Sequence, residues 1–524
     1  MKKLENLLRL SMALIITIIV GIYTFLCLFV NAHVNIYEQV TLTDDIPILS
    51  IIVFLLLVLF ISYLFNHYNF NFKKIFIVLL FLLSIINVFL IFKWNVQPMY
   101  DQQSVLQAAS DLRNGNLGMF SKSGYVGIYP HQLGLISIFY FLSYFIGIYN
   151  FKAIQIINVV FLLISYFSIY KITDLIFSDS RTNSILMFFI LLFVPLSFYV
   201  IFVYGNIFGL AFSLLAIQNT LYYLKDRKIL NIFFASITIL FAIIFKSNYS
   251  ITLVAIMIFL IIDFIFANKK RLCTGIFMIL LVLAYLFSSM APKMLLESVA
   301  NIKVYDGIPK IAWIEMGLQD DWGTPGWYDD YSRRTFINNE YDSKKTNQQV
   351  KIDLMQTIDK FIKNPRYCIS FFYKKTVSQW CDPQFQGPWL LRFTNHYFDS
   401  RILYNFLNIL QNIILLSAFS YFLLNWKNIN INSLILGIVF VGGFIFHMFW
   451  EAKCQYTITY FWLLIPYAAQ GLQILIKDII LNFSNEQPKS FKDACICLFN
   501  TTVFKYIIFI VLWISFRDII RIFI

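Results

Sequence analysis

Long apolar runs, separated by short polar or basic stretches, dominate the pattern of residues along the chain. Two examples are IPILSIIVFLLLVLFISYLF (46–65) and IFMILLVLAYLF (276–287). A helix needs roughly 20 apolar residues to cross the hydrocarbon core of a membrane, and several runs reach that length. The pattern therefore predicts an all-α polytopic membrane protein with about 13 transmembrane helices. The expected spans are residues 8–30, 47–66, 75–93, 153–175, 183–203, 206–224, 229–247, 250–267, 273–291, 402–424, 431–449, 455–476 and 503–523.

Basic residues cluster between these runs and indicate which loops face the cytoplasm. Clusters lie at 2–3, 73–74, 225–228 and 269–271, and cytoplasmic loops carry an excess of Lys and Arg. Residues 94 and 292 then lie outside. The apolar segment 132–148 cannot also cross, because all later clusters would then face outward, so we expect it to lie along or partly enter the outer side.

This topology divides the chain into five parts. They are N-terminal transmembrane helices (1–93), a first external loop with interfacial helices (94–152), central transmembrane helices (153–291), a second large external loop (292–400) and C-terminal transmembrane helices (401–524).

Composition supports the membrane assignment and excludes other classes. The 524 residues are 59% hydrophobic and 13% charged, whereas soluble proteins carry about 25% charged residues. The net charge of +13 falls in short clusters, so no basic domain is present to bind nucleic acid. The first apolar run continues to Val30 without a small-residue cleavage site, which predicts a retained first helix. Seven cysteines without paired spacing predict neither a zinc site nor a disulfide framework.

The sequence also argues against several kinds of transport. No glycine-rich phosphate loop appears, so nothing indicates ATP-driven transport. Few ionisable residues lie inside the apolar runs, whereas a proton or ion relay needs several. The polar chemistry is instead concentrated in the two external loops.

The first external loop begins with YDQQSVLQAASDL (100–112), which predicts a short helix lying in the membrane interface. Val105, Ala108, Ala109 and Leu112 form its apolar stripe. Asp101 falls in the first turn, where the helix dipole favours a carboxylate. Asp101 is therefore either an N-terminal cap or a catalytic group at the boundary between membrane and water.

The next segments carry a resemblance to a known family. Tyr129-Pro130-His131-Gln132 opens the apolar segment 132–148, and FHMFWEAKCQYTITYFWLLIPYAAQGL (446–472) places Glu451, Lys453 and Tyr456 before a late helix. Together with Asp101 they resemble the GT-C glycosyltransferases, in the branch of protein O-mannosyltransferases and lipid A aminoarabinose transferases. The family has two adjacent prolines where this chain has only Pro130. It has an arginine where this chain has Gln455.

The resemblance implies a GT-C-like bundle with two structured external loops, and an inverting transferase that uses a sugar carried on polyprenyl phosphate. The acceptor would be a hydroxyl of an envelope glycan, lipid or protein at the outer face of the plasma membrane. Asp101 would act as the general base, while Lys246, Lys453 and Tyr456 would bind the donor phosphate. Tyr129, His131 and Glu451 would contact substrate. Lys246 could alternatively reach the headgroup layer, and His131 could be structural.

The second external loop offers further candidates for binding substrate. Glu315, Asp320 and Asp321 precede a segment rich in Trp, Gly and Pro, and Arg333 follows it. Carboxylates among aromatic rings suit a carbohydrate, although the same residues suit a solvated loop anchored by Trp. Two adjacent acids without histidine are weak metal ligands, so we expect no metal or other cofactor. Two other functions stay open: a lipid-linked glycan flippase or exporter, and a glycan polymerase or ligase.

Overall fold

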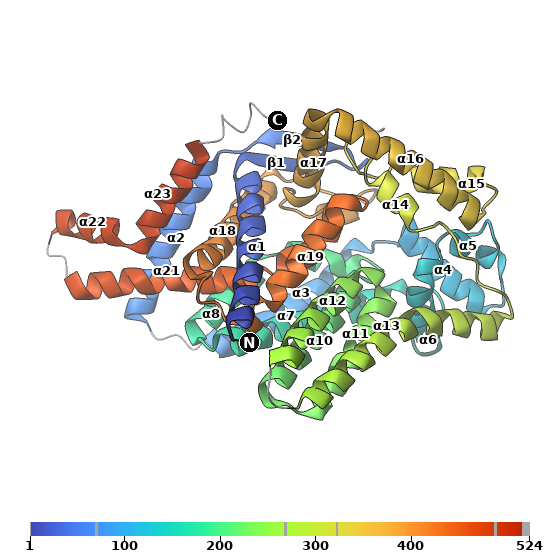
Figure 1. Cartoon of the computed structure of the whole chain (residues 1–524), viewed down its shortest axis with the longest axis horizontal. Helices are drawn as coiled ribbons and strands as arrows, with labels where there is room; N and C mark the ends of the chain where they lie inside the picture. Colours follow the sequence, from blue (N-terminus) through green and yellow to red (C-terminus); the bar gives the residue numbers. More distant parts are fainter. Residues whose placement is uncertain (1, 69–71, 267–269, 321–322, 487–489, 516–524) are drawn as a thin grey trace.

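The computed structural model describes residues 2–68, 72–266, 270–320, 323–486 and 490–515. Helices make up nearly all of this part of the chain (Figure 1). Nine of them are long and apolar enough to cross a membrane. These are α1 (Lys2–Phe29), α2 (Pro47–His67), α3 (Phe72–Trp94), α7 (Phe151–Phe177), α10 (Asn206–Asp226), α12 (Ser250–Phe266) with the turn before it (together Ser247–Phe266), α13 (Arg271–Ala300), α18 (Arg401–Asn425) and α19 (Ile435–Phe449) with the turn before it (together Ile431–Phe449).

Three further spans are bent. Within the described residues, three helix pairs pass the same test together but change direction at a short break, so the chain has up to 12 spans. They are α8 (Ser180–Leu192) with α9 (Pro195–Phe198) and η3 (Tyr199–Ile201), bent by 49°, α20 (Cys454–Trp462) with α21 (Ile465–Glu486), also 49°, and α22 (Phe491–Asn500) with α23 (Thr502–Ser515), 69°. The chain is thus an integral membrane protein of the all-α class.

The predicted count of about 13 spans depends on α11 (Ile229–Phe245). This apolar helix has 17 residues, at the short end of what a crossing needs, and 12 plus this helix gives 13. The count therefore stays a prediction. The remaining helices are α4 (Asp101–Arg113), η1 (Gly118–Phe120), α5 (Tyr125–Ile128), η2 (Pro130–Gln132), α6 (Leu133–Ile146), η4 (Ser247–Tyr249), α14 (Ile311–Met316), α15 (Tyr331–Asn338), α16 (Ser343–Lys363), α17 (Pro365–Trp380), η5 (Pro388–Leu391) and η6 (Ile431–Leu434).

Two helix ends differ from the expected boundaries. α13 continues through Pro292 to Ala300, beyond residue 291, where we expected the span to end. The final predicted span, 503–523, extends beyond the described residues, which end at 515.

Contacts between loops show which loops lie together at each of the two ends of the helix bundle. The basic end holds the loops with the basic clusters: Arg9 donates to the carbonyl of Ile429 (2.9 Å), and Lys270 donates to that of Arg227 (3.0 Å). The opposite end, here called the hairpin end, comprises residues 30–46, 95–150, 202–205, 246, 301–400 and 450–453. In Figure 1 the β-hairpin, α14, α16 and α17 gather at the top and the N-terminus lies at the bottom.

The segment 132–148 stays at the hairpin end. It forms α6, which has only 14 residues and packs along α4. Its first turn touches the end of α11, since a Cβ on Gly134 would lie 2.2 Å from the carbonyl oxygen of Ile244. Its last turn meets the end of α4, where the Arg113 guanidinium lies 3.3 Å from the centre of the Tyr144 ring. The segment therefore packs beside α4 and the end of α11, and its position relative to the membrane stays a prediction.

A two-stranded antiparallel hairpin between α1 and α2 was not predicted. Its strands are β1 (Val30–Val34) and β2 (Val40–Asp44), with Ala32 opposite Leu42. The Asn35 side chain accepts hydrogen bonds from the backbone of Tyr37 and Gln39 and so shapes the turn. The hairpin is joined to α17, because the Ala32 amide donates to the Cys381 carbonyl at 3.0 Å. The N-terminal helices therefore bring a new polar loop to the hairpin end.

Candidate functional site

Polar contacts tie the start of α4 and the segments around it to one another. The Gln102 side chain accepts a hydrogen bond from the backbone of Val203 at 2.8 Å. Gln155, fully buried in α7, donates to the carbonyls of Val96 and Ile201 at 3.1 and 3.0 Å. The predicted apolar stripe of α4 (Val105, Ala108, Ala109 and Leu112) is buried against protein. These contacts fix the position of Asp101, the first residue of the helix.

Asp101 does not cap α4. The cap residue is Tyr100, and its side chain makes no capping hydrogen bond, so the interpretation of Asp101 as an N-terminal cap was wrong. The carboxylate instead accepts a hydrogen bond from the Tyr125 hydroxyl at 3.1 Å. Asp101 is accessible to solvent, but protein surrounds it on most sides. This burial raises its pKa from the ordinary value, although the charge of nearby Lys453 opposes the rise.

Lys453 lies between two carboxylates at the hairpin end. Its ammonium is 3.2 Å from Glu38 and 3.8 Å from Glu451. Burial alone would lower the pKa of Lys453, but these two carboxylates together raise it. Glu451 is 5% exposed, and burial raises its pKa to about 7, against the effect of Lys453. Asp101, Glu38, Glu451 and Lys453 thus form one electrostatic cluster.

Lys246 approaches the same cluster from the end of α11. It donates a hydrogen bond to the Asn206 side chain at 2.9 Å and lies 5.0 Å from the centre of the Tyr456 ring. Tyr456 in turn is 3.5 Å from Glu451. Burial lowers the pKa of Lys246 to about 7, and the charge of Glu451 opposes this only in part. The charge of Lys246 therefore changes with pH near neutrality.

Arg392 adds a cation that sequence reasoning missed. Its side chain is buried, with the guanidinium stacked 3.0 Å from the ring centre of Trp389 and 5.2 Å from that of Tyr100. Burial lowers its pKa to about 10, and Glu38 opposes this. Among the described residues, no carboxylate lies within ion-pair distance of the Arg392 guanidinium. Arg392 is thus a cation beside Tyr100, the residue before Asp101, and it pairs with no carboxylate of the described residues.

Tyr129 and His131 border the cluster, together with Trp313 of α14. Trp313 lies 6.1 Å from Tyr129 and 5.9 Å from His131, measured between ring centres. Burial raises the pKa of Tyr129, as does the charge of Asp101, whereas Arg333 lowers it. Arg333 is largely exposed and lies 3.8 Å from Asp330. Surrounding protein and the charge of Lys310 lower the pKa of His131 to about 4, so His131 is neutral near pH 7.

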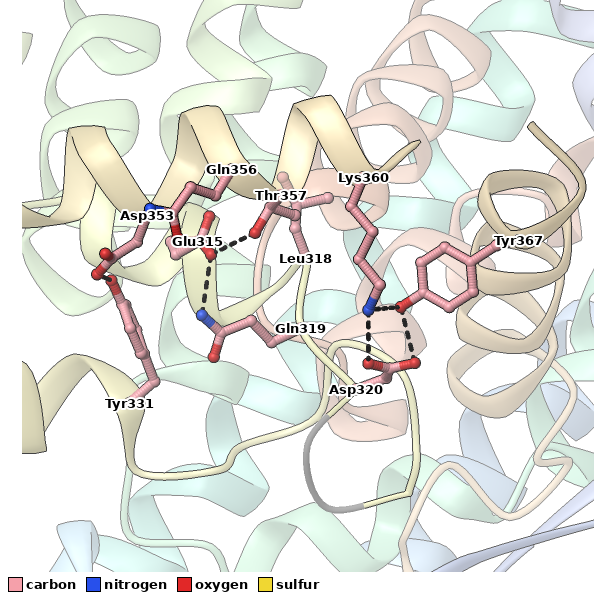
Figure 2. Close-up of a pocket in the computed structure, with 10 residues that line it drawn as sticks. All are labelled: Glu315, Leu318, Gln319, Asp320, Tyr331, Asp353, Gln356, Thr357, Lys360 and Tyr367. Atoms are coloured by element: carbon pink, nitrogen blue, oxygen red, sulfur yellow. Dashed lines mark hydrogen bonds and ion pairs between the residues drawn. The ribbon is translucent and has the colours of Figure 1, made fainter. Parts of the chain in front are cut away.

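The acidic candidates of the second loop lie elsewhere. Glu315 and Asp320 line a separate pocket between α14, α16 and α17 (Figure 2), on the opposite side of α14 from Trp313. The predicted partner Asp321 lies outside the described residues. The eight other candidates lie in or beside the cluster: Asp101, Glu451 and Lys453 belong to it, and Tyr129, His131, Lys246, Arg333 and Tyr456 border it.

The chain matches no protein-family model and no curated protein. The GT-C resemblance of the first loop and late helix therefore remains an expectation from the residues themselves. Within the described parts of the chain, no group of three or more His, Cys, Asp or Glu side chains could hold a metal ion.

Two residues near Asp101, Arg392 and Glu38, were not identified from the sequence. Arg392 lies three residues after Trp389 in the second external loop, and its aromatic neighbours were the only signal for it. Glu38 lies in a short turn that carries no chemical pattern. It reaches the cluster because the hairpin folds over α17, which only tertiary structure reveals.

Proposed function

We propose that this protein is a glycosyltransferase that moves a sugar from a polyprenyl-phosphate donor to a hydroxyl of an envelope glycopolymer, lipid or protein. The reaction would take place at the hairpin end, facing outward, because the basic clusters lie at the opposite end. One observation supports this most. Asp101, an accessible carboxylate, is influenced by the charge of Lys453, and two further cations border the same cluster: Lys246 beside Tyr456, and Arg392 beside Tyr100, the residue before Asp101.

The proposed step needs one base and several cations. The acceptor oxygen attacks the anomeric carbon and gives its proton to the Asp101 carboxylate. The bond between the anomeric carbon and the phosphate oxygen breaks, and its electron pair leaves with that oxygen. The donor phosphodiester becomes a monoester with one more negative charge, which Arg392 and Lys246 would stabilise. Asp101 then releases the proton to solvent.

The raised pKa of Asp101 suits this role. A carboxylate with an ordinary pKa near 3.8 is a weak base, and partial desolvation makes it a stronger one. The charge of Lys453 limits this rise in pKa. Tyr125, which donates to Asp101 at 3.1 Å, would hold the carboxylate in position for the acceptor.

The test is sugar transfer by the purified full-length protein from synthetic polyprenyl-phosphate sugars to envelope glycan fractions. Asp101→Asn should reduce transfer by roughly 10²-fold or more, because a general base contributes about 10²–10⁴-fold. Asp111→Asn is the matched control in the same helix. Its oxygen can still accept the hydrogen bond from Gln107 (2.8 Å), so transfer should persist.

Two outcomes would contradict the proposal. If Asp101→Asn keeps full transfer activity, Asp101 is not the base. If the wild-type protein transfers no sugar but moves a fluorescent lipid-linked glycan across the bilayer of proteoliposomes, the protein is a flippase and the alternative stands.

A further inference from the structure

The segment predicted as the second external loop (292–400) contains a pocket that the proposed reaction does not use. Its volume is about 300 Å³, and it is bounded by α14 and its following loop, α15, α16 and α17. Figure 2 shows α16 along one side, Tyr331 and Gln319 opposite, and Tyr367 closing one end. The ten lining residues are Glu315, Leu318, Gln319, Asp320, Tyr331, Asp353, Gln356, Thr357, Lys360 and Tyr367.

Hydrogen bonds among the lining residues hold its polar groups in place. Glu315, 1% exposed, accepts from Thr357 at 2.7 Å and from Gln319 at 2.9 Å. The Tyr367 hydroxyl receives a hydrogen bond from Lys360 (2.9 Å) and donates one to Asp320 (2.8 Å). Pre-positioned polar groups cost less ordering free energy when a ligand binds. The pocket is therefore built before any ligand arrives.

The lining still offers unused hydrogen-bonding capacity. The side-chain carbonyl of Gln319 is buried and has no hydrogen-bond partner among the described residues. Gln356 is exposed on α16 and lines the mouth of the pocket. A buried carbonyl without a partner costs free energy, so a ligand hydroxyl donating to Gln319 would be favoured.

The charge of the lining limits the chemical class of ligand. Three carboxylates and one lysine face the pocket, so the balance is negative and disfavours phosphate or another anion. The same carboxylates, amides and hydroxyls suit a neutral ligand with many hydroxyl groups. Tyr331 and Tyr367 add aromatic rings on which the C–H groups of a sugar could pack.

Helix α14 lies between this pocket and the residues that border the cluster of Asp101, Glu38, Glu451 and Lys453. Glu315 points to the pocket, whereas Trp313, two residues earlier, contacts Tyr129 and His131. Residues two apart on a helix lie on nearly opposite faces. The pocket and the cluster are therefore separated by about one helix diameter, roughly 10 Å.

We propose that this pocket binds a neutral sugar unit of the acceptor while another unit of the same acceptor presents its hydroxyl to Asp101. The inference rests on the proposed transferase function and narrows it, because an acceptor that fills both places must be a saccharide chain rather than a single lipid headgroup. The pocket would select the acceptor and the cluster would perform the transfer.

The experiment measures binding separately from transfer. Saturation-transfer difference NMR on the detergent-purified full chain uses four probes: the methyl glycosides of glucose, galactose, mannose and N-acetylglucosamine. At least one probe should bind saturably to wild type. Gln356→Ala, on an exposed position, and Tyr367→Phe, which removes one hydroxyl, should each weaken that binding at least several-fold. Met355→Ala is the control, because Met355 is 69% exposed on the same helix and does not line the pocket.

Asp101→Asn separates the two proposals. It should abolish transfer and leave glycoside binding unchanged. If binding follows these predictions but wild type transfers no sugar, the pocket inference survives as a saccharide site and the proposed function falls. The pocket inference is overturned if no probe binds saturably, or if binding persists unchanged in both pocket variants.

Discussion

The ammonium of Lys453, just after α19, lies 3.2 Å from the carboxylate of Glu38, in the hairpin between the first two helices. Glu451 lies on the other side of the same ammonium at 3.8 Å. Lys453 therefore bridges two acids that come from distant parts of the chain. It joins the N-terminal hairpin to the late helices, and it lies beside Asp101.

Removing the charge of Lys453 should destabilise the protein. Lys453→Met leaves Glu38 and Glu451 facing each other without a cation, and breaking a largely buried pair costs about 3 kcal/mol. We expect a loss of this order in the free energy of unfolding, measured in mixed micelles. Adding Glu38→Gln should recover part of it. Equal losses in the single and double variants would show that Glu38 and Lys453 do not interact.

The pH dependence of transfer should report on Lys246. Burial lowers its pKa to about 7, so the side chain is charged below that pH and neutral above it. If its charge binds the donor phosphate, kcat/KM falls as pH rises through about 7. On the acid side, kcat/KM falls as Asp101 becomes protonated, at a pH above the ordinary carboxyl value because its pKa is raised.

Two variants separate Lys246 from Glu451, whose pKa is also about 7. Lys246→Arg keeps the charge at alkaline pH, so the alkaline fall should move upward or disappear. Glu451→Gln should keep that fall but move it to lower pH, because the charge of Glu451 raises the pKa of Lys246. An unchanged profile in Lys246→Arg would exclude Lys246 as its source.

Arg392 should contribute to donor binding rather than to stability alone. Its guanidinium has no carboxylate partner within the described chain, and a hydrogen bond to a charged group is worth about 1.5–3 kcal/mol. Arg392→Ala should therefore raise the KM for the donor by roughly 10- to 100-fold. Arg392→Lys should restore part of the loss. Arg334→Ala, at an exposed position, is the control, and an equal effect there would point to general surface charge.

Gly205 should be sensitive to a single added methyl group. A Cβ there would lie 2.0 Å from the carbonyl oxygen of Phe245, the residue before Lys246. Gly205→Ala must push these backbones apart, and overpacking costs about 1–3 kcal/mol. We expect a lower melting temperature and weaker donor binding. Gly275→Ala is the control, since its Cβ would meet Phe264 at an ordinary 3.5 Å. Equal melting temperatures in the two variants would contradict the prediction.

The sequence predicted the elements that depend on strong local patterns. Apolar runs gave the long spans, because crossing a membrane requires a continuous hydrophobic helix. The stripe of Val105, Ala108, Ala109 and Leu112 predicted α4, and all four are buried. The bent pairs were harder. Two of the pairs were predicted as single straight spans, and in the third the sequence predicted α23 but not α22. A short break between two apolar helices hardly changes the hydropathy, so the bends left no clear pattern.

The sequence predicted less about contacts between distant segments. It identified Lys453 as a cation near the cluster but gave no sign of its partner Glu38. It named Glu315 and Asp320 as substrate-binding candidates together with Tyr129, whereas Glu315 and Asp320 line a separate pocket and Tyr129 packs against Trp313. Both differences arise from tertiary packing. Packing determines the direction in which each face of a short helix points, and composition carries no information about it.

The Glu38–Lys453 contact also has a consequence for biosynthesis. The hairpin is made early, as the first two helices leave the ribosome, whereas its cation arrives only near the end of translation. Until then Glu38 has no Lys453 beside it, and the cluster around Asp101 is incomplete. A nascent chain stalled before α19 should therefore carry an open, inactive centre. Co-expression of the late helices as a separate fragment should restore it.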